Sequence, residues 1–191
     1  LKAALNEGYN KYADHIIPFV EKFDNQTIKD LVDILDWSSV TYKSLQQAAD
    51  CISNKLGIKP PKVCYVEDNS RMEKNFGYRP SKNQILVPHP KYGKINELLS
   101  SSSAVEMLAH EAWHAHQYDL IANNDERAKI YINGHFPEPE QDMKGYFASS
   151  TEQEAYVFGR IIRNKFNQKR EEQYKRDYNT TLGAIAEHLE G

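Results

Sequence analysis

The chain has 191 residues, with 24 lysines and arginines against 27 aspartates and glutamates. The resulting net charge of -3 gives no electrostatic reason to expect a nucleic acid or an anionic membrane as a partner. No apolar run approaches the ~20 residues that a membrane-spanning helix needs, and the length suits a single domain. The two cysteines, Cys51 and Cys64, fall in segments predicted as a helix and a strand. Packed thiols of this kind favour a reducing compartment, so we expect a cytoplasmic location.

The first third of the chain is predicted to be helical. Apolar residues recur at helical spacing over residues 2–22, where Pro18 is expected to kink or split the helix. A second helix is expected to begin at Asp24, and a third runs from about Ser38 or the next residue to a stop at Gly57. Because this pattern is already under way at the first residue, we expect the chain to be a processed product or a domain excised from a longer protein.

The middle of the chain predicts a small sheet, and the remainder is again helical. Short apolar runs bounded by turn residues predict three strands, at 63–66, 76–78 and 84–87. The later elements are expected to be a helix near 95–99, a long helix from Ser103 to about Asn123, a short helix over 126–133, a loop over 135–150, and two final helices over 151–169 and 171–189.

The long helix carries the sequence His110-Glu111-Ala112-Trp113-His114, an H-E-x-x-H motif. Two histidines four residues apart lie on one helix face, where their imidazoles can share a cation, and Zn²⁺ is the first candidate. Glu111 would project beside the metal and take a proton from a water. Two solvent-facing histidines would look the same in the sequence. However, Ser103 and Glu106 form an apparent capping box before a strongly apolar helix, and buried histidines need partners.

A catalytic zinc needs a third protein ligand, and Glu152 and Glu154 are the candidates. At about 100° per residue they flank opposite sides of the apolar stripe of their helix, so periodicity leaves both open. Glu152 shares its face with the small residues Ala155 and Gly159, which would let another helix approach closely. Glu154 has an alternative structural role, since Thr151 and Glu154 match a capping box. These two arguments favour Glu152.

Other polar residues are weaker candidates. His116 points about 140° away from the motif histidines, so a packed or solvent-facing role is expected. Gln117 projects with the histidine pair and is predicted either to form a hydrogen bond near the site or to be a simple polar surface residue. Stabilisation of a reaction intermediate is conceivable for His135, Tyr146 and Tyr156, whereas a turn role is expected for His89 and a surface role for His188.

H-E-x-x-H followed by E-x-x-A on a later helix resembles the gluzincin metallopeptidases, and the layout is similar to the ImmA/IrrE type. It also resembles metallopeptidase domains of phage and mobile-element proteins. The resemblance covers roughly residues 45–165. Its matching segments are Pro60-Pro61-Lys62-Val63, Phe76-Gly77-Tyr78, Ile85-Leu86-Val87, the motif at His110 to His114, and Glu152-Gln153-Glu154-Ala155-Tyr156-Val157-Phe158-Gly159. Matching the last segment residue by residue implies that Glu152 is the third ligand; Tyr156 departs from the polar residue common at its position.

Together these observations predict an α+β, zincin-like domain over residues 1–191. It would comprise a helical lead (1–44), a catalytic core (45–170) and a C-terminal helix (171–191). The predicted function is a zinc metallopeptidase that hydrolyses peptide bonds, with His110, His114 and Glu152 holding Zn²⁺ and Glu111 as general base. A protein or peptide substrate is expected to add along a sheet edge at 76–79. Two alternatives are a non-catalytic, zinc-stabilised helical binding module and a zinc amidase acting on a non-protein amide.

Overall fold

The computed structural model describes residues 12, 15–35, 40–66, 76–88, 100–132 and 149–190, with side chains in the last helix described as far as residue 182. Several expectations lie outside these residues. They concern the start of the first helix, the helix near 95–99, the end of the short helix near 133, and almost all of the loop over 135–150.

The N-terminal helices end and begin where their capping residues predict. Residues 15–20 are helical, and α2 (Asn25–Ile34) then begins after Asp24, whose side chain accepts a hydrogen bond from the Thr27 N–H at 2.8 Å. Helix α3 (Tyr42–Leu56) begins after Thr41, whose hydroxyl accepts from the Ser44 N–H at 3.1 Å, so the predicted start at Ser38 or Ser39 is wrong. The helix ends at Gly57, which has the left-handed φ of 76°. The predictions for Asp24 and Gly57 are therefore confirmed. Both features could be predicted because they depend on local backbone chemistry alone.

Three short strands form a mixed sheet beside these helices. They are β1 (Lys62–Tyr65), β2 (Gly77–Arg79) and β3 (Gln84–Val87), each within one residue of its predicted position. The order is β1-β3-β2, with β1 parallel and β2 antiparallel to β3, so β2 lies at an edge. At the opposite edge, α3 side chains bond to Val63 of β1: Gln46 accepts from its N–H at 2.8 Å, and the Tyr42 hydroxyl donates to its carbonyl.

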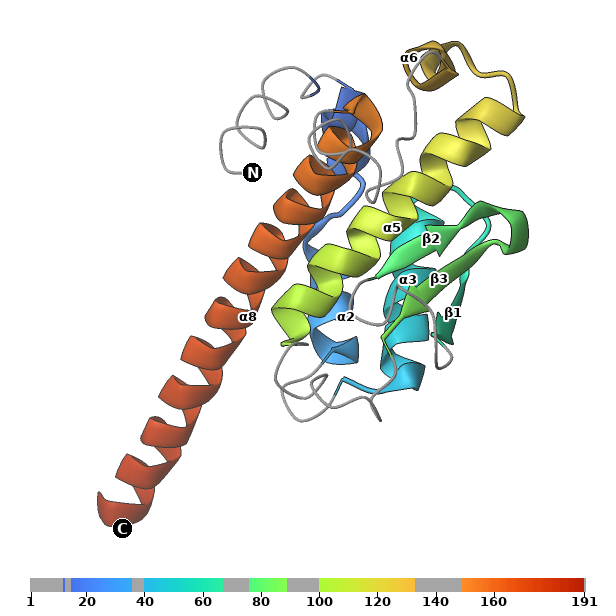
Figure 1. Cartoon of the computed structure of the whole chain (residues 1–191). Coiled ribbons are helices and arrows are strands. Elements are labelled where there is room, and N and C mark those ends of the chain that lie inside the picture. The colour runs from blue at the N-terminus through green and yellow to red at the C-terminus, as the bar shows by residue number, and fades with distance from the viewer. Residues whose placement is uncertain are drawn as a thin grey trace.

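Helix α5 (Ser101–Ala122) passes between the sheet and the last helix, as Figure 1 shows. Its N-cap is Ser100, whose hydroxyl accepts from the Ser103 N–H at 3.2 Å. The predicted Ser103–Glu106 capping box is therefore wrong. Since the N-cap lies three residues earlier than predicted, Ser103 is already inside the helix, and the Glu106 carboxylate instead pairs with Arg160 and Arg163. A 3₁₀ turn (Glu126–Ala128) and the short α6 (Lys129–Ile132) follow.

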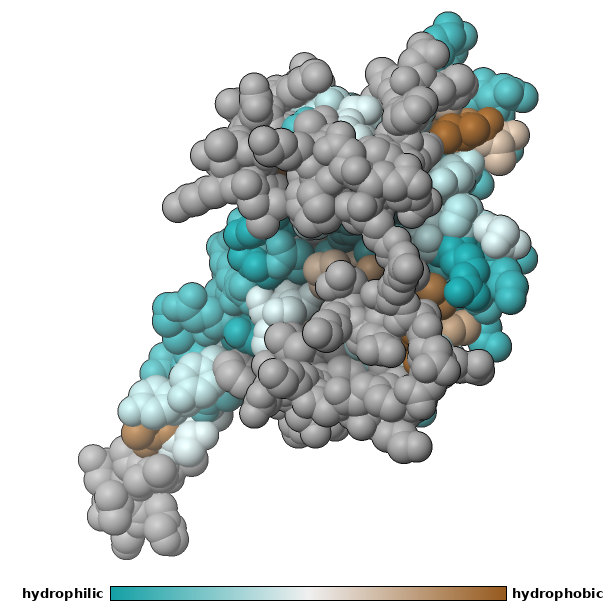
Figure 2. Space-filling model, viewed as in Figure 1, coloured by the Kyte–Doolittle hydropathy of each residue, from teal (hydrophilic) through white to brown (hydrophobic). Residues whose placement is uncertain are grey.

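The chain ends in one helix, α8 (Ser150–Glu190), and the prediction of two final helices is wrong. Residues 160–182 contain no glycine or proline to interrupt it. The charged run instead forms pairs one turn apart, Lys169 with Glu172 and Glu171 with Lys175. The first half of α8 packs along α5, whereas the second half projects from the body of the protein (Figure 1). Up to residue 182, the visible surface of this second half is mostly hydrophilic (Figure 2).

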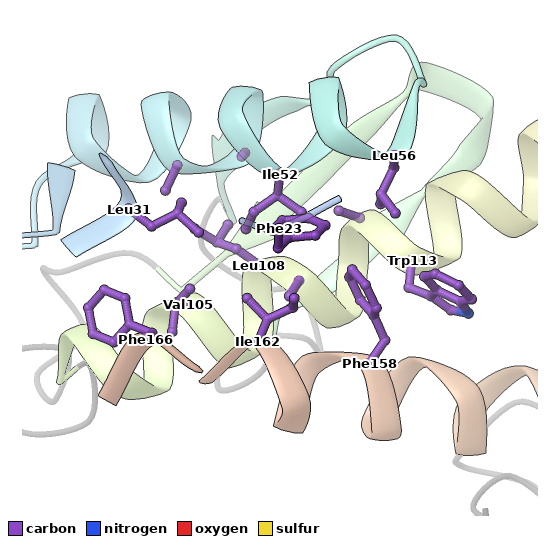
Figure 3. Packing of buried hydrophobic residues seen from close by; sticks show 14 of the residues in the cluster. Phe23, Leu31, Ile52, Leu56, Val105, Leu108, Trp113, Phe158, Ile162 and Phe166 are labelled. Atoms are coloured by element: carbon purple, nitrogen blue, oxygen red, sulfur yellow. The ribbon is translucent and has the colours of Figure 1, made fainter. Parts of the chain in front are cut away.

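The main core lies between α5, α8 and the N-terminal helices. Phe158, Ile162 and Phe166 of α8 face Val105 and Leu108 of α5, as Figure 3 shows. This packing confirms the predicted apolar stripe of α8, and it fixes the rotation of α8 relative to α5. Within the described residues, no helix is both long enough and apolar enough to cross a membrane.

Candidate metal centre

His110 and His114 lie one turn apart in the middle of α5, and both are buried. Their Nε2 atoms are 3.1 Å from each other. Burial of the pair follows from the apolar residues that precede and follow it in this helix, as the sequence predicts. The solvent-facing alternative for the motif histidines is therefore excluded.

Glu152 enters the same place from the first turn of α8. One carboxylate oxygen lies 3.1 Å from His114 Nε2, and the other lies 3.4 Å from His110 Nε2. The small residues on this face permit the approach: a Cβ on Gly159 would come within 2.7 Å of the Glu106 carbonyl oxygen and 3.4 Å of the His110 Cβ. The predicted close approach on the Glu152 face is thus confirmed.

The spacing of these atoms fits a small tetrahedral cation. With Zn–N and Zn–O bonds of about 2.0–2.1 Å, two ligand atoms of a tetrahedral zinc lie about 3.3 Å apart. The distances among His110 Nε2, His114 Nε2 and the Glu152 oxygens are 3.1, 3.1 and 3.4 Å. In addition, Glu152 Oε2 is buried and has no hydrogen-bond partner in the described structure beyond its 3.4 Å contact with His110, so it is free to bind a further positively charged group.

Glu111 lies beside this group. Together, His110, Glu111 and His114 offer ligand atoms that all lie within 4.8 Å of one another, so they form a possible metal site by themselves. The nearest Glu111 oxygen is 3.9 Å from His110 Nε2, farther than the Glu152 contacts, and its carboxyl accepts a hydrogen bond from the backbone of Tyr78 in β2. Burial raises the pKa of Glu111 above its usual value, although the neighbouring histidines oppose this shift.

The ionisable groups of the site favour a positive charge beside Glu152. Burial by itself would lower the pKa of His114, but the hydrogen bond and the negative charge of Glu152 outweigh burial and raise this pKa to about 9. Burial likewise opposes ionisation of Glu152, yet contacts with His110 and His114 hold the pKa of this carboxyl well below its usual range. The site therefore favours a positive charge at His114 next to the Glu152 carboxylate.

Glu154 faces a different environment. Its Oε2 accepts hydrogen bonds from Trp113 Nε1 at 3.2 Å, Gln117 Nε2 at 3.2 Å and the Tyr131 hydroxyl at 2.5 Å, and its Oε1 lies 2.9 Å from His15 Nδ1. The predicted capping role of Glu154 is therefore wrong. The helix begins at Ser150, so Thr151 is already inside it, and the Glu154 carboxylate points into the protein.

The remaining candidates divide between described and undescribed residues. His116 is buried between Phe19 and Trp113, so of the two expected roles, packed or solvent-facing, the packed one is correct. Burial, and to a lesser extent the positive charge of Arg127, lowers the pKa of His116 to about 4. The Tyr156 ring lies 4.4 Å from the His110 ring, between centroids. His89, His135, Tyr146 and the side chain of His188 lie outside the described structure.

The chain matches no known protein family, no curated protein and no solved structure. The functional argument therefore rests on the site itself.

Three polar contacts of the site were not predicted from the sequence. Tyr78, Tyr131 and His15 belong to segments far from the motif, and nothing in their spacing predicts contact with it. Gln117 is different, since its position three residues after His114 places both on one helix face. Its Oε1 lies 2.9 Å from His114 Nδ1, so the hydrogen-bonding alternative for this residue is the correct one.

Proposed function

We propose that this chain is a zinc-dependent metallopeptidase of the gluzincin type, similar in layout to the ImmA/IrrE proteins. The observation that carries the proposal is the convergence of His110 Nε2, His114 Nε2 and the Glu152 carboxylate, 3.1–3.4 Å apart, on one buried point. Two imidazoles and one carboxylate are the protein ligands of catalytic zinc in several peptidases, where a fourth position is left for water.

Glu111 is the proposed general base. When bound, zinc would lower the pKa of a coordinated water and polarise the scissile carbonyl. The Glu111 carboxyl lies next to the three proposed ligands, and the Tyr78 N–H holds it in place. It would accept a proton from the water that attacks the carbonyl and pass this proton to the leaving amine. A buried carboxyl of raised pKa suits both transfers.

An extended peptide beside β2 is the proposed substrate. Of the two outer strands, β1 has its edge bonded by side chains of α3, whereas β2 lies next to α5. Successive residues of an antiparallel strand direct their N–H groups to opposite sides, and the Tyr78 N–H is directed at Glu111. A peptide that lies along this edge would therefore be next to Glu111.

Metal content and hydrolysis test the proposal separately. Purified protein should contain about one zinc per chain, which His110→Ala or His114→Ala should remove. His116→Phe is the matched control, because His116 is a buried histidine of the same helix that packs between Phe19 and Trp113. This variant should retain the metal; a metal content in His110→Ala equal to that of the parent would refute the site.

Glu111→Gln should retain zinc and lose hydrolysis of a broad peptide library. Equal cleavage by the parent and by Glu111→Gln would refute the general-base role. Zinc binding without cleavage by either protein would favour the binding module, and cleavage of non-peptide amides alone would favour the amidase.

A further inference from the structure

We propose that Gln117 and Glu154 form a positioning relay for the metal centre, in which Gln117 orients the His114 ring and Glu154 orients Gln117. This inference rests on the proposed function and deepens it, because it assigns a metal-tuning role to residues that touch neither the metal nor the substrate. The relay also connects the centre to two elements that contribute no proposed ligand, α6 and the N-terminal helical segment.

The orientation of the Gln117 amide is determined by its neighbours. Its Nε2 lies 3.1 Å from the Thr151 carbonyl oxygen and 3.2 Å from Glu154 Oε2. The carbonyl oxygen can only accept, and Glu154 Oε2 also accepts from Trp113 Nε1 and the Tyr131 hydroxyl. The amide group must therefore point at them, which leaves Gln117 Oε1 facing His114 Nδ1 at 2.9 Å. The reversed amide would place an oxygen against two acceptors.

This orientation selects the metal-binding tautomer of His114. Because Gln117 Oε1 can only accept, His114 must carry its proton on Nδ1 and donate it. The lone pair of the neutral ring then lies on Nε2, the atom that is 3.1 Å from both His110 Nε2 and Glu152 Oε1. A ring turned or protonated the other way would present an N–H to the cation, and the cation would not bind.

Glu154 holds Gln117 in turn. Its side chain is fully buried, and Trp113, Gln117 and Tyr131 of α6 donate hydrogen bonds to its Oε2. His15 of the N-terminal segment contacts the other oxygen, Oε1, through Nδ1 at 2.9 Å. Because Glu154 Oε2 accepts from Gln117 Nε2, it polarises the amide and so increases the electron donation of His114 to a cation, as outer carboxylates do at other metal sites.

Gln46 provides a matched control in the same chain. Its Oε1 accepts from the Val63 N–H at 2.8 Å, and its Nε2 donates to Asp50 and to the Pro61 carbonyl at 2.8 and 3.1 Å. It thus makes as many contacts as Gln117, but it joins α3 to β1 and lies in neither the motif helix nor α8. Loss of its hydrogen bonds should affect folding stability alone.

The test compares zinc dissociation constants of purified, folded protein by competition with a graded chelator. Gln117→Met keeps the length of the side chain and removes its hydrogen bonds, and we expect zinc to bind about 10–100-fold more weakly. Gln46→Met should leave the zinc constant unchanged. The visible absorption of the Co²⁺-loaded protein should change in Gln117→Met and not in Gln46→Met, since the band reports the ligand geometry.

Glu154→Gln separates charge from shape. Its amide oxygen can still accept from Gln117 and Tyr131 while its amide group faces His15, so we expect zinc to bind more weakly by several-fold to about tenfold. A parent protein that binds no zinc refutes the proposed function itself. A parent that binds zinc while Gln117→Met binds it equally well overturns the relay. If Gln117→Met does not fold, Glu154→Gln decides, and a zinc constant equal to that of the parent overturns the relay.

Discussion

Gly159→Ala tests the close contact between α5 and α8 on which the site depends. The added Cβ would lie 2.7 Å from the Glu106 carbonyl oxygen, and 3.4 Å from both the backbone nitrogen and the Cβ of His110. The obstacle is a backbone carbonyl inside α5, which cannot rotate away as a flexible side chain could. The two helices must therefore separate by a few tenths of an ångström beside His110.

Two opposing terms set the size of the effect. Alanine is favoured over glycine in a helix by about 0.5–1 kcal/mol, whereas overpacking of a tight contact costs about 1–3 kcal/mol. We expect a net loss of about 1–2 kcal/mol in the free energy of unfolding of the metal-free protein. Separation of the helices also draws Glu152 away from His110 and His114. Since metal–ligand distances tolerate only about ±0.2 Å, zinc should bind at least about tenfold more weakly.

Urea unfolding of the metal-free protein measures the first effect as a lower midpoint at an unchanged slope, and chelator competition measures the second. Gly183→Ala in the same helix is the control. It follows the exposed residues 175–182, so alanine there should leave zinc binding unchanged and stabilise the helix slightly. A Gly159→Ala protein that is as stable as the parent and binds zinc equally well would refute the close helix contact.

Three further changes separate local from tertiary contributions. Glu152→Ala should weaken zinc binding, measured by chelator competition, more than Glu154→Ala does. Glu154→Ala should lower the melting temperature more, because it leaves several buried donors unpaired at about 1–3 kcal/mol each. The reverse order for zinc binding would assign the third ligand to Glu154. Gly57→Ala should cost about 1 kcal/mol in urea unfolding, since its φ of 76° is unfavourable for alanine and no described atom lies within 4 Å of the new Cβ; no loss would contradict the left-handed helix end. Hydrogen bonds from Thr27 lower the pKa of Asp24 from 3.8. The ionised Asp24 therefore stabilises the folded protein above that pH, and this contribution is lost as the pH falls through the lowered pKa. The stability difference between the parent and Asp24→Ala should shrink on acidification, and a constant difference would contradict the N-cap role.

The sequence by itself determined the features that depend on neighbours along the chain. The cap at Asp24 and the helix end at Gly57 follow from the chemistry of one or two residues and the next turn. The adjacency of His110 and His114 follows from helical periodicity, which places residues four apart side by side. Their burial follows from the apolar residues around them in the same helix. The short strands follow from apolar runs between turn residues, to within one residue.

Boundaries and partners that depend on distant groups were less predictable. Glu106 and Glu154 both occupy capping-box spacings, yet each carboxylate bonds to groups far away in the sequence, Arg160 and Arg163 in one case and His15 among the donors in the other. A local capping hydrogen bond competes with hydrogen bonds to distant groups. When the distant group is charged or polar and buried, its hydrogen bond is the stronger of the two. Local spacing therefore predicted a capping role that neither glutamate has in the folded protein.

Only the tertiary structure decided which glutamate lies beside the motif histidines. Helical periodicity places Glu152 and Glu154 symmetrically about the apolar stripe of α8, so it cannot distinguish them. The rotation and distance of α8 relative to α5 make the difference, and these depend on core packing and on the contact at Gly159. With α8 in this position, Glu152 reaches His110 and His114, whereas Glu154 accepts hydrogen bonds from Trp113, Gln117 and Tyr131.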